Sequence, residues 1–137
     1  MKRLVIDASV ILKTLLKEDP NVYKTFETLL KKAIKGEITL LSSKLLAIEV
    51  ANGLRFSLQD KKASLNIYKD FLNLPIKTIV LTRVQKEESL RIAYDLGSSV
   101  YDSSYHILAK AQRAVFLTGD GVYFKKANIL GDIEFLG

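Results

Sequence analysis

The sequence predicts an α/β fold, in which a central, mostly parallel β-sheet is covered by helices on both faces. Short apolar runs rich in β-branched residues, typical of buried strands, alternate along the chain with segments of helical periodicity. The chain has 137 residues and is 48% hydrophobic, so it has the length and the apolar content of one ordinary domain. No repeat, low-complexity tract or linker divides it.

Turn and capping residues separate the predicted elements. Ser9, Asp19 and Thr82 are predicted N-caps, because their side-chain oxygens can accept hydrogen bonds from the first backbone N–H groups of a helix. Gly36 and Pro75 are predicted to end helices. We expect strands at residues 3–6, 38–41, 76–81, 114–117 and near 133–135. Between them we expect helices at 10–17, from Asp19-Pro20 to Gly36, from Ser42 or Ser43 to about 58, at 59–74, 82–97 and 101–113, and a short one at 123–127.

The composition excludes several classes of function. There is no cysteine, which excludes disulfides, thiolate zinc sites and cysteine nucleophiles and fits a reducing cytoplasm. No apolar segment reaches the length of a membrane span, and Asp7 and Lys13 interrupt the apolar N-terminal run, so we expect no membrane segment or signal peptide. A formal charge of +6 favours a polyanionic partner such as a nucleic acid, although solvated surface lysines explain it about equally well.

Two aspartates follow predicted strands. Asp7 comes directly after the first strand, and Asp120 follows the apolar run at 114–117 and the pair Thr118-Gly119. The carboxyl ends of parallel strands meet at the same edge of a sheet, where ligands bind in such folds. Asp is also common in turns and caps, so each residue alone is a weak signal, but two at equivalent strand ends predict a shared site.

Glu49 lies in a helix that is apolar on nearly every side. It is the only charge between Lys44 and Arg55, and we therefore expect this helix to be buried. A buried carboxylate is costly unless it is paired or bound to a metal. Asn52 lies three residues later and shares a face with Glu49. The alternative is a Glu at the solvent edge, or one that pairs with Arg55.

Asp102 is predicted to open the helix at 101–113, where an acid also complements the helix dipole. Taken together with Asp7, Glu49 and Asp120, it would give four carboxylates that repel one another unless a cation neutralises them. Oxygen ligands of this kind favour hard cations such as Mg²⁺ or Mn²⁺, which activate water and stabilise charge on a phosphodiester. These acids on a basic chain therefore suggest phosphate chemistry on a nucleic acid.

Four short motifs, in this order and spacing, resemble those of the PIN-domain family, and within it the VapC-type toxins of toxin–antitoxin pairs. The resemblance covers essentially the whole chain, so we expect residues 1–137 to form a single PIN-like nuclease domain. The motifs are Val5-Ile6-Asp7-Ala8-Ser9, Ala47-Ile48-Glu49-Val50-Ala51-Asn52, Val100-Tyr101-Asp102-Ser103-Ser104-Tyr105 and Leu117-Thr118-Gly119-Asp120.

The resemblance implies a cytoplasmic, Mg²⁺- or Mn²⁺-dependent endoribonuclease that leaves a 5′-phosphate and a 3′-hydroxyl. The metal ligands and catalytic residues would be Asp7, Glu49, Asp102 and Asp120, with Ser9, Asn52 and Thr118 in support. It also implies a homodimer, an RNA substrate and a cognate antitoxin, whose helix or tail would lie in an apolar groove and block the acidic site.

Two alternative functions remain open, and single residues exclude two other classes of enzyme. A catalytically inactive PIN-like module that binds RNA or protein, and an RNA-processing nuclease outside a toxin–antitoxin pair, are the alternatives. A haloacid-dehalogenase phosphatase would need a second Asp at the position of Ser9. A ribonuclease that uses two histidines is excluded, because His106 is the only one, and we expect it to be an ordinary helix-face residue without a function.

Overall fold

A computed structural model describes residues 2–137. Its centre is a five-stranded sheet in the order β3-β2-β1-β4-β5, and every neighbouring pair is parallel. The α/β prediction is therefore confirmed, with a sheet that is wholly parallel where we expected a mostly parallel one. The strands are β1 (Lys2–Ile6), β2 (Ile38–Ser43), β3 (Ile76–Ile79), β4 (Val115–Thr118) and β5 (Ile133–Phe135).

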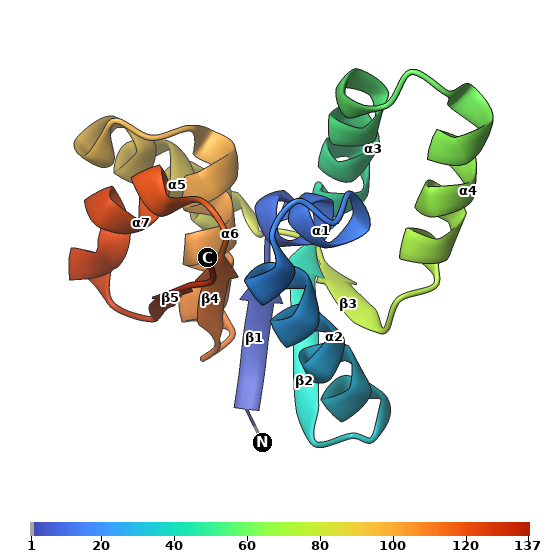
Figure 1. The fold of residues 1–137 in the computed structure, drawn as a ribbon. Coiled ribbons are helices and arrows are strands. Elements are labelled where there is room, and N and C mark those ends of the chain that lie inside the picture. Colours follow the sequence, from blue (N-terminus) through green and yellow to red (C-terminus); the bar gives the residue numbers. More distant parts are fainter. Residues whose placement is uncertain (1) are drawn as a thin grey trace.

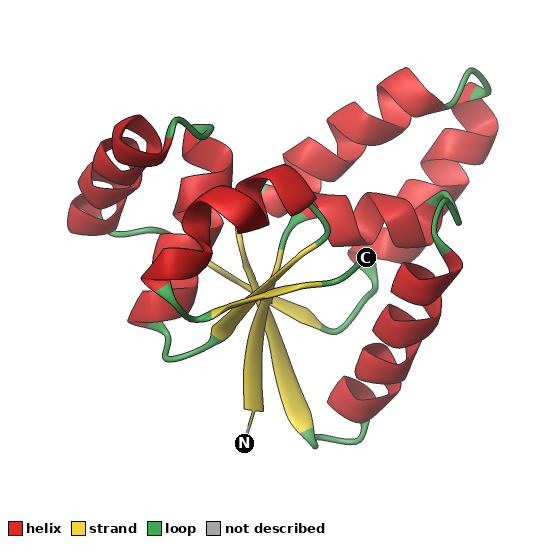
Figure 2. Ribbon diagram, turned by 60° about the vertical axis from the view of Figure 1, so that its left-hand side comes forward, coloured by secondary structure: helices red, strands yellow, loops and turns green. Residues whose placement is uncertain are grey.

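Helices cover both faces of the twisted sheet (Figures 1 and 2). In Figure 1, α5, α6 and α7 lie on one side of the molecule, while α3 and α4 form a helical hairpin on the other. None of the helices within the described residues is long and apolar enough to cross a membrane. The helices are α1 (Ala8–Leu15), α2 (Pro20–Ile34), α3 (Leu46–Ser57), α4 (Lys61–Leu72), α5 (Arg83–Leu96), α6 (Val100–Ala111) and α7 (Gly121–Ala127), followed by a 3₁₀ turn at Asn128–Leu130.

The core lies on both faces of β1, the middle strand. Val5 and Ile6 are consecutive, so their side chains point to opposite faces of the sheet, and both are fully buried. Phe26 of α2, Leu108 of α6 and Phe116 of β4 complete the same cluster. A strand buried on both faces reads as a continuous apolar run, which explains why residues 3–6 were recognisable in the sequence.

Several capping residues are as predicted. Asp19 is the N-cap of α2, with Pro20 in its first turn, and Thr82 forms a capping box with Gln85 at the start of α5. Gly97 ends α5 in the left-handed conformation, with a φ of +65°. Helix α4 is shorter than expected, because Asp60 caps it and it ends before Asn73, Leu74 and Pro75.

Two predicted N-caps are wrong. Asp7, and not Ser9, caps α1, because the Asp7 carboxylate accepts a hydrogen bond from the backbone N–H of Val10. Ser42 and Ser43 belong to β2 and do not cap α3, whose N-cap is Leu45 without a side-chain hydrogen bond. The Ser42 hydroxyl instead donates to the backbone carbonyl of Ile6 in the neighbouring strand, at 2.7 Å.

The prediction that the helix carrying Glu49 is buried all round is also wrong. Only one face of α3 packs into the core, through residues such as Leu46, Val50 and Leu54. Ile48 and Phe56 are 71% and 75% exposed on the outer side. The hairpin of α3 and α4 stands out from the sheet (Figure 1), and no element within residues 2–137 covers that apolar face.

Candidate active site

Asp7 and Asp120 meet because β1 and β4 are adjacent and parallel, with Ile6 in register with Leu117. Thr118, the last residue of β4, lies between the two acids and is fully buried. Its hydroxyl donates to Asp7 Oδ2 at 2.6 Å and accepts a hydrogen bond from the backbone N–H of Asp120 at 3.0 Å. A single side chain thus links the two strand ends that the sequence predicted to share a site.

Asp7 is held more firmly than any other acid of the cluster. Only 2% of it is exposed, and its Oδ1 accepts hydrogen bonds from the Ser9 hydroxyl at 2.5 Å and from the Val10 N–H at 3.1 Å. Burial raises the pKa of Asp7, and Asp120 raises it further, while the hydrogen bonds to Ser9, Thr118 and Val10 act in the opposite direction.

In the loop between Thr118 and Asp120, the backbone N–H and carbonyl of Gly119 are both hydrogen-bonded to side chains of α1. The Gly119 N–H donates to Ser9 Oγ at 2.8 Å, and Lys13 Nζ donates to the Gly119 carbonyl at 2.6 Å. A Cβ atom at Gly119 would lie 3.1 Å from Ser9 Oγ and 3.4 Å from Lys13 Cδ. Glycine therefore allows the loop to approach α1 closely enough to make these bonds.

Glu49 reaches the site from the first turn of α3 and is half-buried. The Tyr105 hydroxyl of α6 donates to Glu49 Oε1 at 2.9 Å. Burial raises the pKa of Glu49 to about 7; the Tyr105 hydrogen bond lowers it, while the charges of Asp7 and Asp102 raise it. Near neutral pH the Glu49 carboxyl is therefore protonated for part of the time.

Asp102 lies in the first turn of α6, one residue later in the helix than expected, because the helix begins at Val100 with Ser99 as N-cap. The backbone N–H of Asp102 donates to Ser99 Oγ at 3.1 Å. Burial raises the pKa of Asp102 to about 6, with further increases from the charges of Asp120 and Asp7 and an opposing effect of Ser99. The acid also complements the dipole of α6.

The four predicted acids thus lie near one another: besides burial, Asp7 and Asp102 raise the pKa of Glu49, and Asp120 raises the pKa values of Asp7 and Asp102. Their oxygens suit a hard divalent cation, and such a cation would relieve their repulsion. Within residues 2–137, however, no three acidic or histidine side chains converge tightly enough to form a ready metal site. The donor chemistry therefore fits Mg²⁺ or Mn²⁺, and binding would require the acids to draw together.

The supporting residues differ in their positions. Ser9 and Thr118 contact Asp7 as described, whereas Asn52 is exposed one turn from Glu49 on α3, and across residues 2–137 no polar contact joins its side chain to an acid. Sequence reasoning missed Lys13 and Tyr105. Lys13 had a signal, since it is a charge within an apolar helix one turn after Ser9, and Tyr105 lies three residues after Asp102 on the same helix face.

Comparisons with known proteins bear on the family and the fold. The family model for the PIN domain matches residues 4–130. Among curated proteins, none matched the sequence. Among solved structures, VapBC2 from Rickettsia felis, described as bound to a DNA fragment from its promoter, is similar with a TM-score of 0.71 and 17% identity, covering 98% of this chain and 99% of that one.

Two further solved structures show the same fold. FitAcB from Neisseria gonorrhoeae is similar with a TM-score of 0.65 and 16% identity over 98% of this chain and 96% of that one. PAE2754 from Pyrobaculum aerophilum has a TM-score of 0.60 and 22% identity over 92% of this chain and 86% of that one. At these identities the likeness establishes the fold alone.

Proposed function

Because the chain belongs to the PIN-domain family of nucleases, we propose that it is a Mg²⁺- or Mn²⁺-dependent endoribonuclease. The observation that carries the proposal is the gathering of four carboxylates at the carboxyl edge of the sheet. Asp7, Glu49, Asp102 and Asp120 come from separate elements, and the charges of Asp7, Asp102 and Asp120 raise the pKa values of their neighbours in the cluster. A structural role alone does not explain so much unfavourable charge in one place.

The four acids would hold the cation, which would supply an activated water and stabilise the charge that develops on the phosphodiester. Asp7 would fix one side of the site, since Ser9 and Thr118 hold its two oxygens. Glu49, whose Oε1 accepts a hydrogen bond from the Tyr105 hydroxyl, would hold the cation from the helix side once its carboxyl is ionised. Asn52, exposed beside Glu49, would contact the RNA.

We further propose that the protein is the cytoplasmic toxin of a toxin–antitoxin pair. The fold is that of VapBC2 and FitAcB, and another similar solved structure is a toxin–antitoxin complex from Klebsiella pneumoniae, with a TM-score of 0.60 and 12% identity over 98% of both chains. A groove of about 580 Å³ lies between α3 and α4, with Leu54, Leu58, Leu65 and Tyr68 among its lining residues. We propose that an apolar helix or tail of the antitoxin occupies this groove.

We also propose a homodimer. The exposed apolar residues of α3 would be covered by a partner chain more favourably than by water. Size-exclusion chromatography with light scattering tests this: a mass of one chain would contradict the dimer without affecting the assignment as a nuclease.

The test of the nuclease is cleavage of a panel of structured RNAs by the purified protein with Mn²⁺, with EDTA, and by the variant Asp7→Asn. We expect cleavage that needs the metal and falls at least about 100-fold in the variant, because Asp7 is proposed as a metal ligand. The matched control is Asp70→Asn on the exposed side of α4, which should cleave at the wild-type rate.

Equal cleavage by wild type and Asp7→Asn would contradict the proposed site. RNA binding without cleavage in any metal would instead support the inactive binding module. An active protein that no antitoxin inhibits would support an RNA-processing nuclease outside a toxin–antitoxin pair.

A further inference from the structure

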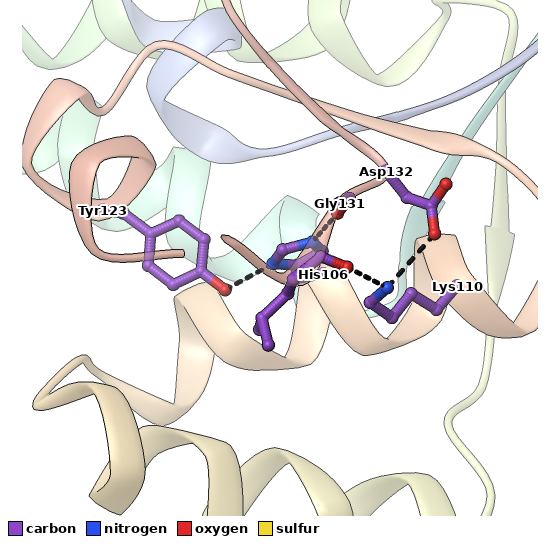
Figure 3. A network of polar contacts seen from close by, with 6 residues as sticks. His106, Lys110, Tyr123, Gly131 and Asp132 are labelled. Carbon is purple, nitrogen blue, oxygen red and sulfur yellow. Dashed lines mark hydrogen bonds and ion pairs between the residues drawn. The ribbon is translucent and has the colours of Figure 1, made fainter. Parts of the chain in front are cut away.

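His106, which the proposed mechanism does not use, connects three parts of the chain. It is fully buried in α6, and both ring nitrogens have partners (Figure 3). Nδ1 lies 2.8 Å from the hydroxyl of Tyr123 in α7, and Nε2 lies 2.7 Å from the carbonyl oxygen of Gly131 before β5. The expectation of an ordinary helix-face histidine is therefore wrong, because this side chain sits inside the protein.

These contacts assign the tautomer of the imidazole. A carbonyl oxygen only accepts hydrogen bonds, so Nε2 must carry a proton for the bond to Gly131. In a neutral ring Nδ1 is then the acceptor, and the Tyr123 hydroxyl donates to it. Burial lowers the pKa of His106 and so favours the neutral ring; Lys110 lowers it further, while the Gly131 carbonyl and Asp132 act in the opposite direction.

Tyr123 connects His106 to the acidic cluster. Its backbone N–H donates to Asp120 Oδ1 at 3.1 Å, so the same residue contacts Asp120 through its backbone and His106 through its side chain. The Tyr123 hydroxyl also lies near Ser103, the neighbour of Asp102. His106 itself lies one helical turn after Asp102 on α6.

We propose that His106, acting through Tyr123, is a positioning residue that fixes the helix bearing Asp102 against the helix capped by Asp120. This inference rests on the proposed metal site. Since the four acids do not yet converge on a common point, the spacing of α6 and α7 sets how far Asp102 and Asp120 must move to bind the same cation. Partners of metal ligands that lie outside the coordination sphere have this effect in other sites.

An outer layer of the same network provides a control. Lys110 Nζ donates to Asp132 Oδ2 at 3.1 Å and to the backbone carbonyl of Leu130 (Figure 3). These bonds close the turn before β5, where Gly131 and Asp132 both have positive φ. Lys110→Met should therefore loosen this turn while leaving the link between His106 and Tyr123 intact.

The experiment compares Mn²⁺ affinity, measured by calorimetry, with thermal stability in wild type, Tyr123→Phe, His106→Asn and Lys110→Met. We expect Tyr123→Phe to weaken Mn²⁺ binding about tenfold. His106→Asn keeps an acceptor for the Tyr123 hydroxyl and loses the donor to Gly131, so it should bind Mn²⁺ within about threefold of wild type despite a lower melting temperature. Lys110→Met should lower the melting temperature without changing the affinity.

An unchanged Mn²⁺ affinity in Tyr123→Phe would overturn the positioning role. Because His106 is the only histidine in the sequence, NMR of its imidazole nitrogens gives a second test. We expect the Nε2–H tautomer at pH 7, with signals that shift when Mg²⁺ is added. A doubly protonated ring would overturn the assignment, whereas the expected tautomer in a protein that binds no metal would contradict the proposed function instead.

Discussion

The two sides of the acidic cluster are held in different ways. On the strand side, Asp7 is buried and accepts hydrogen bonds from two hydroxyls and one backbone N–H, while Asp120 follows a loop fastened to α1 through Gly119. On the helix side, Glu49 and Asp102 are half-buried, as is Asp120, and among the described residues the one side-chain donor to Glu49 is Tyr105.

This difference indicates that the strand side of the site is preorganised to bind a cation, whereas the helix side is not. The strand side should rearrange little when a cation binds, because neighbouring donors already fix the Asp7 carboxylate. The helix side can adjust. Burial, together with the charges of neighbouring acids, raises the pKa values of Glu49 and Asp102, so a bound cation or a proton would stabilise these two groups.

Thr118→Val tests the strand side, because it removes the hydroxyl that links Asp7 and Asp120. The variant keeps the shape of the buried side chain but removes the donor to Asp7 and the acceptor for the Asp120 N–H. We expect cleavage to fall about 10- to 100-fold and stability to fall by about 1–3 kcal/mol. The measurements are cleavage rates and urea unfolding, with Thr28→Val on the exposed face of α2 as control. Wild-type cleavage by the variant would show that the strand side needs no such fixing.

Tyr105→Phe tests the adjustable side with the loss of one hydrogen bond. We expect a smaller effect on the maximal rate, below about tenfold, since Glu49 has freedom to reposition. The Tyr105 hydrogen bond lowers the pKa of Glu49, so its removal should raise that pKa and shift the pH–rate profile to higher pH. A profile that does not move would argue against Glu49 as a metal ligand that must lose its proton before cleavage.

The metal-free protein should become less stable as pH rises. The pKa values of Glu49 and Asp102 are raised to about 7 and about 6 in the folded state. The native state therefore binds more protons than the unfolded state above the ordinary carboxyl range, and this contribution to stability is lost as pH rises toward 7. Melting temperatures in EDTA from pH 4.5 to 7.5 measure it, and Glu49→Gln should flatten the decline; a slope equal to that of wild type would contradict this assignment.

Of these variants, Lys13→Met should have the smallest effect. The direction of the change in Mn²⁺ affinity shows which role Lys13 has. If Lys13 acted only through its charge, its removal would strengthen Mn²⁺ binding to the acids. Because Lys13 Nζ holds the Gly119 carbonyl, we expect instead a weakening of a few-fold, with Lys13→Arg close to wild type. The exposed Lys17→Met at the end of the same helix is the control. Stronger binding in Lys13→Met would contradict the role in holding the loop.

The sequence allowed the fold and the location of the acids to be predicted, because both follow from local patterns. Buried strands of a parallel sheet are continuous apolar runs, and acids directly after two of them must meet at one edge. The donors that hold those acids were less accessible to local patterns: Thr118 was named as a supporting residue only through the family resemblance, and Tyr105 was missed. Thr118 contacts Asp7 across 111 positions, and Tyr105 contacts Glu49 across 56. No local pattern encodes such pairs.

The exposed face of α3 shows a different limit. An apolar helix was expected to be buried, but Ile48 and Phe56 point away from the rest of the chain. Periodicity reports which residues avoid water, and not whether this chain or another one covers them. His106 was misjudged for a related reason, since its partners Tyr123 and Gly131 lie 17 and 25 positions away.

Calorimetric titration of Mn²⁺ at pH 6.5, in buffers of different ionisation enthalpy, shows whether the four acids form one divalent-metal site. With pKa values of about 7 for Glu49 and about 6 for Asp102, these two groups together hold about one proton at this pH. We predict that one cation binds with release of at least about one proton, since burial also raises the pKa of Asp7, and that Asp7→Asn abolishes the binding. Binding without proton release that survives Asp7→Asn, or no binding at all, would contradict the account.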